Sequence, residues 1–259
     1  MRAIWSGSIN FGLVNIPIRL YPATQDKNLD FDYLHEKDLS PVRYAKVCKK
    51  EEKEIKSEDI VRGFEISEGN YIAISNEDIK RASPEKSNSI QILSFAKEAD
   101  IDSEYFETPY YIEPDKNAKK AYHLLYEALK ETETVAVASF ILRTRETLGV
   151  IKVHKNLLVL NRLRWNEEIR DYTELEIPKD ERISGAEVEM AISLIKKQTK
   201  KFDPSDYTDT YREKLEKMIK AKSAGKKLPE VKETKPSAKV TDLMSLLKES
   251  LEDGKSASA

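Results

Sequence analysis

The residues that usually carry catalysis are sparse in this sequence and poorly placed for it. Glu54-Ile55-Lys56 imitates the last part of a metal-dependent nuclease motif, but no upstream Asp on a paired strand accompanies it. Cys48 has no Cys or His neighbour at metal-ligand spacing, and only the Glu51 carboxylate lies close in sequence. The histidines stand far apart, at His35, His123 and His154. No phosphate-binding loop, dinucleotide glycine pattern or HExxH zinc motif is present. We therefore expect no cofactor and no metal site, and we keep a nuclease only as an alternative.

Positive charge is the more informative chemical signal because it is unevenly spread. Residues 143–164 contain six basic side chains against one acidic one, a net charge of +5, whereas residues 64–115 carry −8. A second basic group lies in a loop-rich segment with few apolar residues, and consists of Arg43, Lys46, Lys49, Lys50, Lys53 and Lys56. Residues 196–227 hold a third excess, which ordinary solvated helix faces explain equally well.

The first of these groups falls on predicted strands. Side chains of a strand alternate between its two faces, so basic residues two apart share a face. The pairs are Arg143 with Arg145, Lys152 with His154, and Arg162 with Arg164. If the strands form a meander, the three pairs would line up across one surface, and such a surface binds phosphates by charge without reading bases. A solvated sheet face is the alternative.

Composition limits the classes to which the chain can belong. Its 259 residues suffice for one large domain, or for a core of about 200 residues with an arm and a tail. The formal net charge of −2 excludes a uniformly basic nucleic-acid binder, so any polyanion site is a local patch. A single cysteine excludes a disulfide framework within the chain. No apolar run suits a signal peptide or a membrane span, so we expect a soluble, intracellular protein with a reduced thiol.

Apolar alternation predicts a β-rich core. The alternation over residues 9–13 continues over residues 16–20 on the opposite parity, which predicts a bulge or sharp bend in one long strand. Residues 64–66 and 71–74 flank a polar turn and predict a hairpin. Further strands are predicted at residues 90–93, 110–112, 134–145, 147–154 and 157–165, with a helix after Asp115. We expect these strands to form a barrel or a curled sheet.

Beyond residue 182 the pattern becomes helical. Ser184 and Glu187 form a capping box at the start of one helix, and a second helix closes near Gly225. Two amphipathic helices after a β core resemble an arm whose apolar faces need a surface to pack against. A polar linker at residues 229–239 leads to a short amphipathic helix at residues 240–252. A helix this short needs support in water, so it packs on the body or, as we favour, binds a partner.

The opening 21 residues, MRAIWSGSINFGLVNIPIRLY, resemble the start of bacterial Ku, the DNA-end-binding family of non-homologous end joining. Further segments resemble the family in the same order: residues 59–65, Tyr105-Phe106 with residues 109–114, residues 142–146, Phe202-Asp203-Pro204 with Tyr207, Asp209 and residues 211–213, and Asp242-Leu243-Met244 with Leu247, Ser250 and Leu251. The resemblance therefore covers nearly the whole chain.

This resemblance implies a non-enzymatic, ring-shaped homodimer that threads onto double-stranded DNA ends and recruits ligase D. Its implied location is the cytoplasm, in association with the nucleoid and with no membrane. The implied fold is α+β and β-rich. Residues 1–182 would form a Ku-type β-barrel core including a DNA-encircling bridge at about 26–75, residues 183–228 a helical C-terminal arm, and residues 229–259 a flexible linker with a short amphipathic tail helix. A metal-dependent nuclease and an interaction adaptor without DNA affinity remain the alternatives.

The candidate site residues are chosen by charge and placement. The DNA-binding candidates are Arg43, Lys46, Lys49, Lys50 and Arg62 on the bridge, and Arg143, Arg145, Arg162 and Arg164 on the strands. The partner-binding candidates are Leu243, Met244, Leu247 and Leu251 in the tail. Many bacterial relatives carry Cys-x-x-Cys in the bridge, whereas Glu51 stands at the second of these positions here. A zinc or redox role is therefore not expected of this segment.

Overall fold

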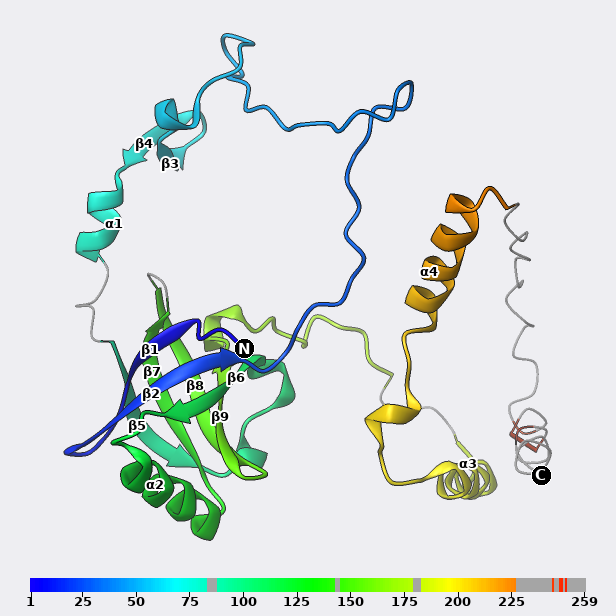
Figure 1. The fold of residues 1–259 in the computed structure, drawn as a ribbon. Coiled ribbons are helices and arrows are strands. Elements are labelled where there is room, and N and C mark those ends of the chain that lie inside the picture. Colours follow the sequence, from blue (N-terminus) through cyan, green and yellow to red (C-terminus); the bar gives the residue numbers. More distant parts are fainter. Residues whose placement is uncertain are drawn as a thin grey trace. The chain divides into compact units, whose positions relative to one another are not determined.

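The computed structural model describes residues 1–82, 88–142, 145–178 and 183–226, together with Met244, Leu247, Lys248 and Ser250. The chain divides into two compact units, Met1–Tyr172 and Thr173–Ala259 (Figure 1). The finer division into core, bridge, arm and tail stays a prediction.

Seven strands of the first unit close into a barrel. They are β1 (Trp5–Phe11), β2 (Val14–Pro22), β5 (Ser89–Ala96), β6 (Phe106–Pro114), β7 (Val135–Leu142), β8 (Arg145–His154) and β9 (Leu157–Leu163). Their order around the barrel is β1-β2-β6-β9-β8-β7-β5, and a parallel pairing of residues 8–10 with residues 89–91 closes the ring. The other neighbouring strands pair antiparallel. The predicted β-rich fold with a β-barrel core is confirmed.

The first two strands correct one expectation. Residues 5–22 form a hairpin and not a single bent strand, with Gly12 in the left-handed region (φ 58°) at the turn. Ile9 lies opposite Ile16 and Gly7 lies opposite Ile18, and directly opposed residues share a face of the sheet. An odd-numbered residue therefore shares a face with an even-numbered one. This is why the apolar alternation changes parity across the turn.

The helix α2 (Lys119–Thr132) lies against the barrel where β8 turns into β9 (Figure 1). Its buried Leu125 and Leu129 belong to the same apolar core as Leu158 of β9. Tyr126 Oη donates to the carbonyl oxygen of Lys155 in the β8–β9 turn at 2.7 Å. The helix thus closes one end of the barrel with both apolar and polar contacts.

The chain between β2 and β5 makes a long excursion from the barrel. It contains a two-stranded sheet, β3 (Arg62–Ser67) and β4 (Asn70–Ile74), and the helix α1 (Asn76–Ala82). The predicted hairpin is confirmed, with Ser67 opposite Asn70. Upstream of β3, two isolated β-bridges pair the chain with itself, Leu34 with Pro41 and Val47 with Glu54. We call residues 26–75 the bridge segment.

The second unit is helical where it is described. It contains α3 (Gly185–Gln198) and α4 (Thr210–Ser223). The predicted capping box is confirmed, because Ser184 Oγ accepts from the Glu187 amide at 3.3 Å and Glu187 Oε2 accepts from the Ser184 amide at 2.7 Å. Asp209 caps α4 by accepting from the Arg212 amide at 3.0 Å.

Short 3-10 turns complete the elements. They are η1 (Ser57–Asp59), η2 (Glu98–Asp100), η3 (Ser103–Tyr105), η4 (Asn166–Glu168) and η5 (Pro204–Asp206). Within the described ranges, no helix has the length and apolar character that crossing a bilayer requires.

Tyr122 of α2 ties two barrel strands together. Its hydroxyl donates to the carbonyl oxygen of Ile112 in β6 at 3.1 Å and accepts from the amide of Leu158 in β9 at 2.7 Å. Burial of the side chain raises the pKa of the Tyr122 phenol above its ordinary value. The folded chain therefore holds this phenol in its neutral form.

Tyr122→Phe is expected to lower the free energy of unfolding by about 1–3 kcal/mol, because the partly buried Leu158 amide loses its acceptor. The contribution of the phenol is fully present below a pH of about 10, the unfolded pKa of Tyr. It is lost as the pH rises from there through the raised folded pKa, because the unfolded chain releases the proton first. Urea unfolding at neutral and alkaline pH measures both effects. Tyr172→Phe, at an exposed side chain, is the control, and equal midpoints for the two variants would contradict the assignment.

Candidate nucleic-acid interface

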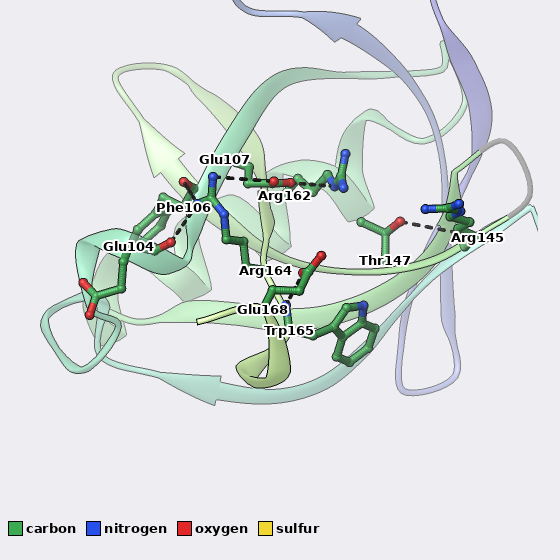
Figure 2. A network of polar contacts seen from close by, with 9 residues as sticks. All are labelled: Glu104, Phe106, Glu107, Arg145, Thr147, Arg162, Arg164, Trp165 and Glu168. Atoms are coloured by element: carbon green, nitrogen blue, oxygen red, sulfur yellow. Dashed lines mark hydrogen bonds and ion pairs between the residues drawn. The ribbon is translucent and has the colours of Figure 1, made fainter. Parts of the chain in front are cut away.

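The register of the barrel decides which basic side chains share a face. Arg162 lies opposite Gly149, and Arg145 has the same parity as Gly149, so Arg145 and Arg162 share one face. Lys152 has the other parity, so the expectation that all three basic pairs line up on one surface is wrong for Lys152. Arg145 starts β8, about 13 Å along the strand from Gly149, and Figure 2 shows it apart from Arg162. Arg143 lies outside the described residues.

Arg162 and Arg164 converge on one carboxylate, that of Glu107 (Figure 2). Arg162 Nε lies 2.9 Å from Glu107 Oε2, and Arg164 Nη2 lies 3.6 Å from Glu107 Oε1. Arg164 Nη1 also donates to the carbonyl oxygens of Glu104 at 2.7 Å and Phe106 at 3.0 Å. The antiparallel pairing of β6 with β9 brings these residues together. We call Glu107, Arg162 and Arg164 the arginine cluster.

Lys152 is engaged on the opposite face. Its ammonium group makes an ion pair with Glu98 and lies 5.5 Å from the centre of the Phe106 ring. Glu98 and Glu107 both come from the acidic stretch, residues 64–115, and their partners come from the basic stretch, residues 143–164. The charge separation along the sequence is thus partly cancelled in the folded barrel.

Sequence reasoning missed Glu107. One signal was available, because an acidic stretch and a basic stretch both fall on predicted strands and opposite charges favour each other across a sheet. The alternation alone could not find the contact, because the pairing of β6 with β9 shifts register between Phe106 and Pro109. A bulge of this kind re-aims side chains in a way that period-two counting does not capture.

On the bridge segment, Lys49 and Lys50 are exposed in a tight turn. The Cys48 amide donates to the Lys53 carbonyl oxygen at 2.9 Å, and the Glu52 amide donates to the Cys48 carbonyl oxygen at 2.8 Å. Glu52 closes the turn in the left-handed region, at φ 53°. The turn presents its two lysines to solvent.

The other bridge candidates are also exposed. Arg43 Nη2 lies 3.3 Å from Glu54 Oε2, yet 84% of the Arg43 side chain remains exposed. Lys46 is exposed in its loop and Arg62 starts β3. Nearby, hydrogen bonds from the Ser40 amide and hydroxyl, and then from His35, hold the pKa of Asp38 below its ordinary value.

The nuclease alternative gains no support from this segment. Glu54 is the partner of Arg43, and Lys56 Nζ lies 3.6 Å from Glu58. In the part of the chain that the structure describes, no group of three or more His, Cys, Asp or Glu side chains is placed to hold a metal ion. The motif-like Glu54-Ile55-Lys56 therefore stands without a carboxylate cluster around it.

The tail candidates are only partly described. Met244 and Leu247 are helical and half-buried, whereas Leu243 and Leu251 lie outside the described residues. A role of these four side chains in binding a partner stays a prediction.

Comparison with known proteins decides the family. Residues 10–190 match the family model described as the Ku70/Ku80 beta-barrel domain. This chain belongs to the Ku family. Three relatives named "Non-homologous end joining protein Ku" are those of Heliobacterium modesticaldum, 39% identical over 98% of this chain and 93% of the relative; Opitutus terrae, 38% identical over 97% and 91%; and Pseudomonas aeruginosa, 37% identical over 96% and 88%. The resemblance carried by the opening residues of this Ku chain is confirmed.

The exposed bridge lysines give a direct test. If they contact phosphates, Lys49→Glu with Lys50→Glu is expected to weaken binding to every duplex sequence alike. The salt dependence should also become shallower by about two units in the slope of log K against log salt, because each phosphate contact contributes about 0.9. Fluorescence anisotropy over a series of salt concentrations measures both. The control Lys119→Glu with Lys120→Glu changes net charge equally at the exposed start of α2, and an equal loss in both variants would contradict a specific role for the bridge.

Proposed function

We propose that this Ku chain binds the ends of double-stranded DNA without regard to sequence, in the repair of double-strand breaks by non-homologous end joining. The observation that carries the proposal is the similarity, over nearly the full chain, to relatives whose names state that process. The exposed basic side chains support it, because charge on a bridge and on fixed arginines suits phosphates rather than base edges. In this proposal the protein is a scaffold and not an enzyme.

The proposed active form is a homodimeric ring. The β3–β4 sheet argues for a partner that covers it, because an isolated two-stranded sheet is only marginally stable in water. Its apolar side chains are largely exposed, at 67% for Phe64, 61% for Tyr71 and 50% for Ile72. A second copy of the chain that covers this sheet would bury these side chains.

The helices of the second unit support the same assembly. On α3, Val188, Ile192 and Ile195 are exposed at helical spacing, and on α4 Met218 and Ile219 are exposed. An amphipathic helix gains most of its stability by burying such a face. We propose that a second copy of the chain supplies the covering surface.

We propose further that the tail helix recruits ligase D, with Leu243, Met244, Leu247 and Leu251 as its apolar face. Their spacing places them along one side of a helix, which is the pattern of a segment that docks in a groove. We also propose that the protein acts in the cytoplasm, in association with the nucleoid.

The ring predicts a topological preference. Linear duplex is expected to bind strongly, and covalently closed circles of the same sequence are expected to stay free, because a closed ring can load only at an end. A gel-shift titration at moderate salt compares the two. Equal binding to both forms would contradict threading and leave an open basic surface. A failure to bind either form would favour the adaptor.

The dimer has its own test. Phe64→Glu with Ile72→Glu is expected to yield monomers in sedimentation velocity, because the two opposed apolar side chains would become charged within the proposed interface. Binding to linear duplex should fall in the same variant. Glu68→Gln, in the exposed turn of the same hairpin, is the control and should remain dimeric. A double variant with the sedimentation coefficient of the control would contradict this interface.

A further inference from the structure

Two guanidinium groups meet one carboxylate at the end of β9 that lies away from α2. The distances are 2.9 Å from Arg162 Nε to Glu107 Oε2 and 3.6 Å from Arg164 Nη2 to Glu107 Oε1. The Arg162 and Arg164 side chains are 40% and 37% exposed, whereas Glu107 is 23% exposed and its Oε2 is buried. Solvent therefore still reaches both arginines although their shared carboxylate is more deeply placed.

The arginine cluster has donors to spare. A guanidinium carries five N–H donors. Arg162 turns its Nε toward Glu107, and its Nη1 and Nη2 make no hydrogen bond to the described part of the chain. Paired N–H groups of this kind match two oxygens of a phosphate. A phosphate can therefore be bound by Arg162 while Glu107 keeps its own contact.

Arg164 is also anchored by hydrogen bonds to the main chain. Arg164 Nη1 is fixed by the carbonyl oxygens of Glu104 and Phe106, and the Arg164 amide donates to the carbonyl oxygen of Tyr105 at 2.8 Å. These contacts fix Arg164 against the start of β6 (Figure 2). An anchored side chain loses little conformational freedom when it binds an anion.

We propose that Arg162 and Arg164 form a binding position for one backbone phosphate of duplex DNA, and that Glu107 is a built-in counter-charge that orients both guanidinium groups and limits the affinity of this position. The proposal rests on the proposed DNA-binding function. Glu107 reduces the charge of the cluster from +2 to +1. A weaker phosphate contact lets a protein move along a duplex instead of being fixed at one position.

The test is Glu107→Gln, which keeps the shape of the side chain and removes its charge. We expect linear duplex to bind roughly three- to tenfold more tightly, because one negative charge near the phosphate is removed. The slope of log K against log salt should steepen by up to about one unit. The control is Glu104→Gln, because the Glu104 carboxylate points away from Arg164 (Figure 2). Its affinity and slope should stay close to those of the unchanged protein.

A second variant separates the outcomes. Arg162→Gln is expected to weaken binding and to make the slope of log K against log salt shallower by about one unit. When Arg162→Gln is combined with Glu107→Gln, the gain in affinity from Glu107→Gln should disappear. Thermal unfolding checks that each variant is folded. If the unchanged protein binds linear duplex, equal or weaker binding by Glu107→Gln, or no effect of Arg162→Gln, would overturn this proposal alone. If the unchanged protein binds no duplex, the proposed function is overturned with it.

Discussion

The parallel pairing of β1 with β5 is the contact on which the rest of the first unit depends. It closes the barrel through residues 8–10 and 89–91, which are far apart in sequence. Since β1 lies between β2 and β5 in the ring, the chain must leave the barrel after β2 and re-enter on the far side of β1. Parallel neighbours always need such a crossover. Here the crossover carries the bridge segment, so the exposed bridge lysines are a consequence of how the barrel closes.

The pairing of strands within the barrel also determines where charged side chains lie in the folded protein. The pairing of β6 with β9 places Glu107 beside Arg162 and Arg164, and Glu98 binds Lys152 on the other face. Uneven charge along the sequence is therefore a poor measure of surface charge. On the barrel, acidic and basic stretches meet across neighbouring strands. On the bridge segment, the lysines at the Cys48–Lys53 turn remain exposed, as do most residues of that segment.

Local signals predicted local structure well. The capping box at Ser184 and Glu187 and the hairpin at residues 64–74 involve residues a few positions apart, whose interactions depend little on the rest of the chain. The opening strands failed as a prediction because a change of parity is produced equally by a bulge and by a two-residue turn. Only the partner strand distinguishes them. The contact of Arg162 with Glu107 was missed for the same reason. It depends on how β6 pairs with β9, and that pairing shifts register between Phe106 and Pro109.

The two groups of basic side chains differ in what they can contribute to binding a duplex. Lys49 and Lys50 are exposed on a short turn, so they supply charge but must lose rotamer freedom on contact. Arg164 is already fixed by two carbonyl oxygens and by Glu107, so its guanidinium group has a defined orientation. The Glu107 carboxylate neutralises part of its charge. In the proposed complex with DNA, attraction at a distance would therefore depend mainly on the lysines of the bridge segment, and contact with individual phosphates on the arginines of the barrel. The proposed clamp, which holds a duplex without fixing its position, would need both kinds of contact, with the fixed contacts kept weak.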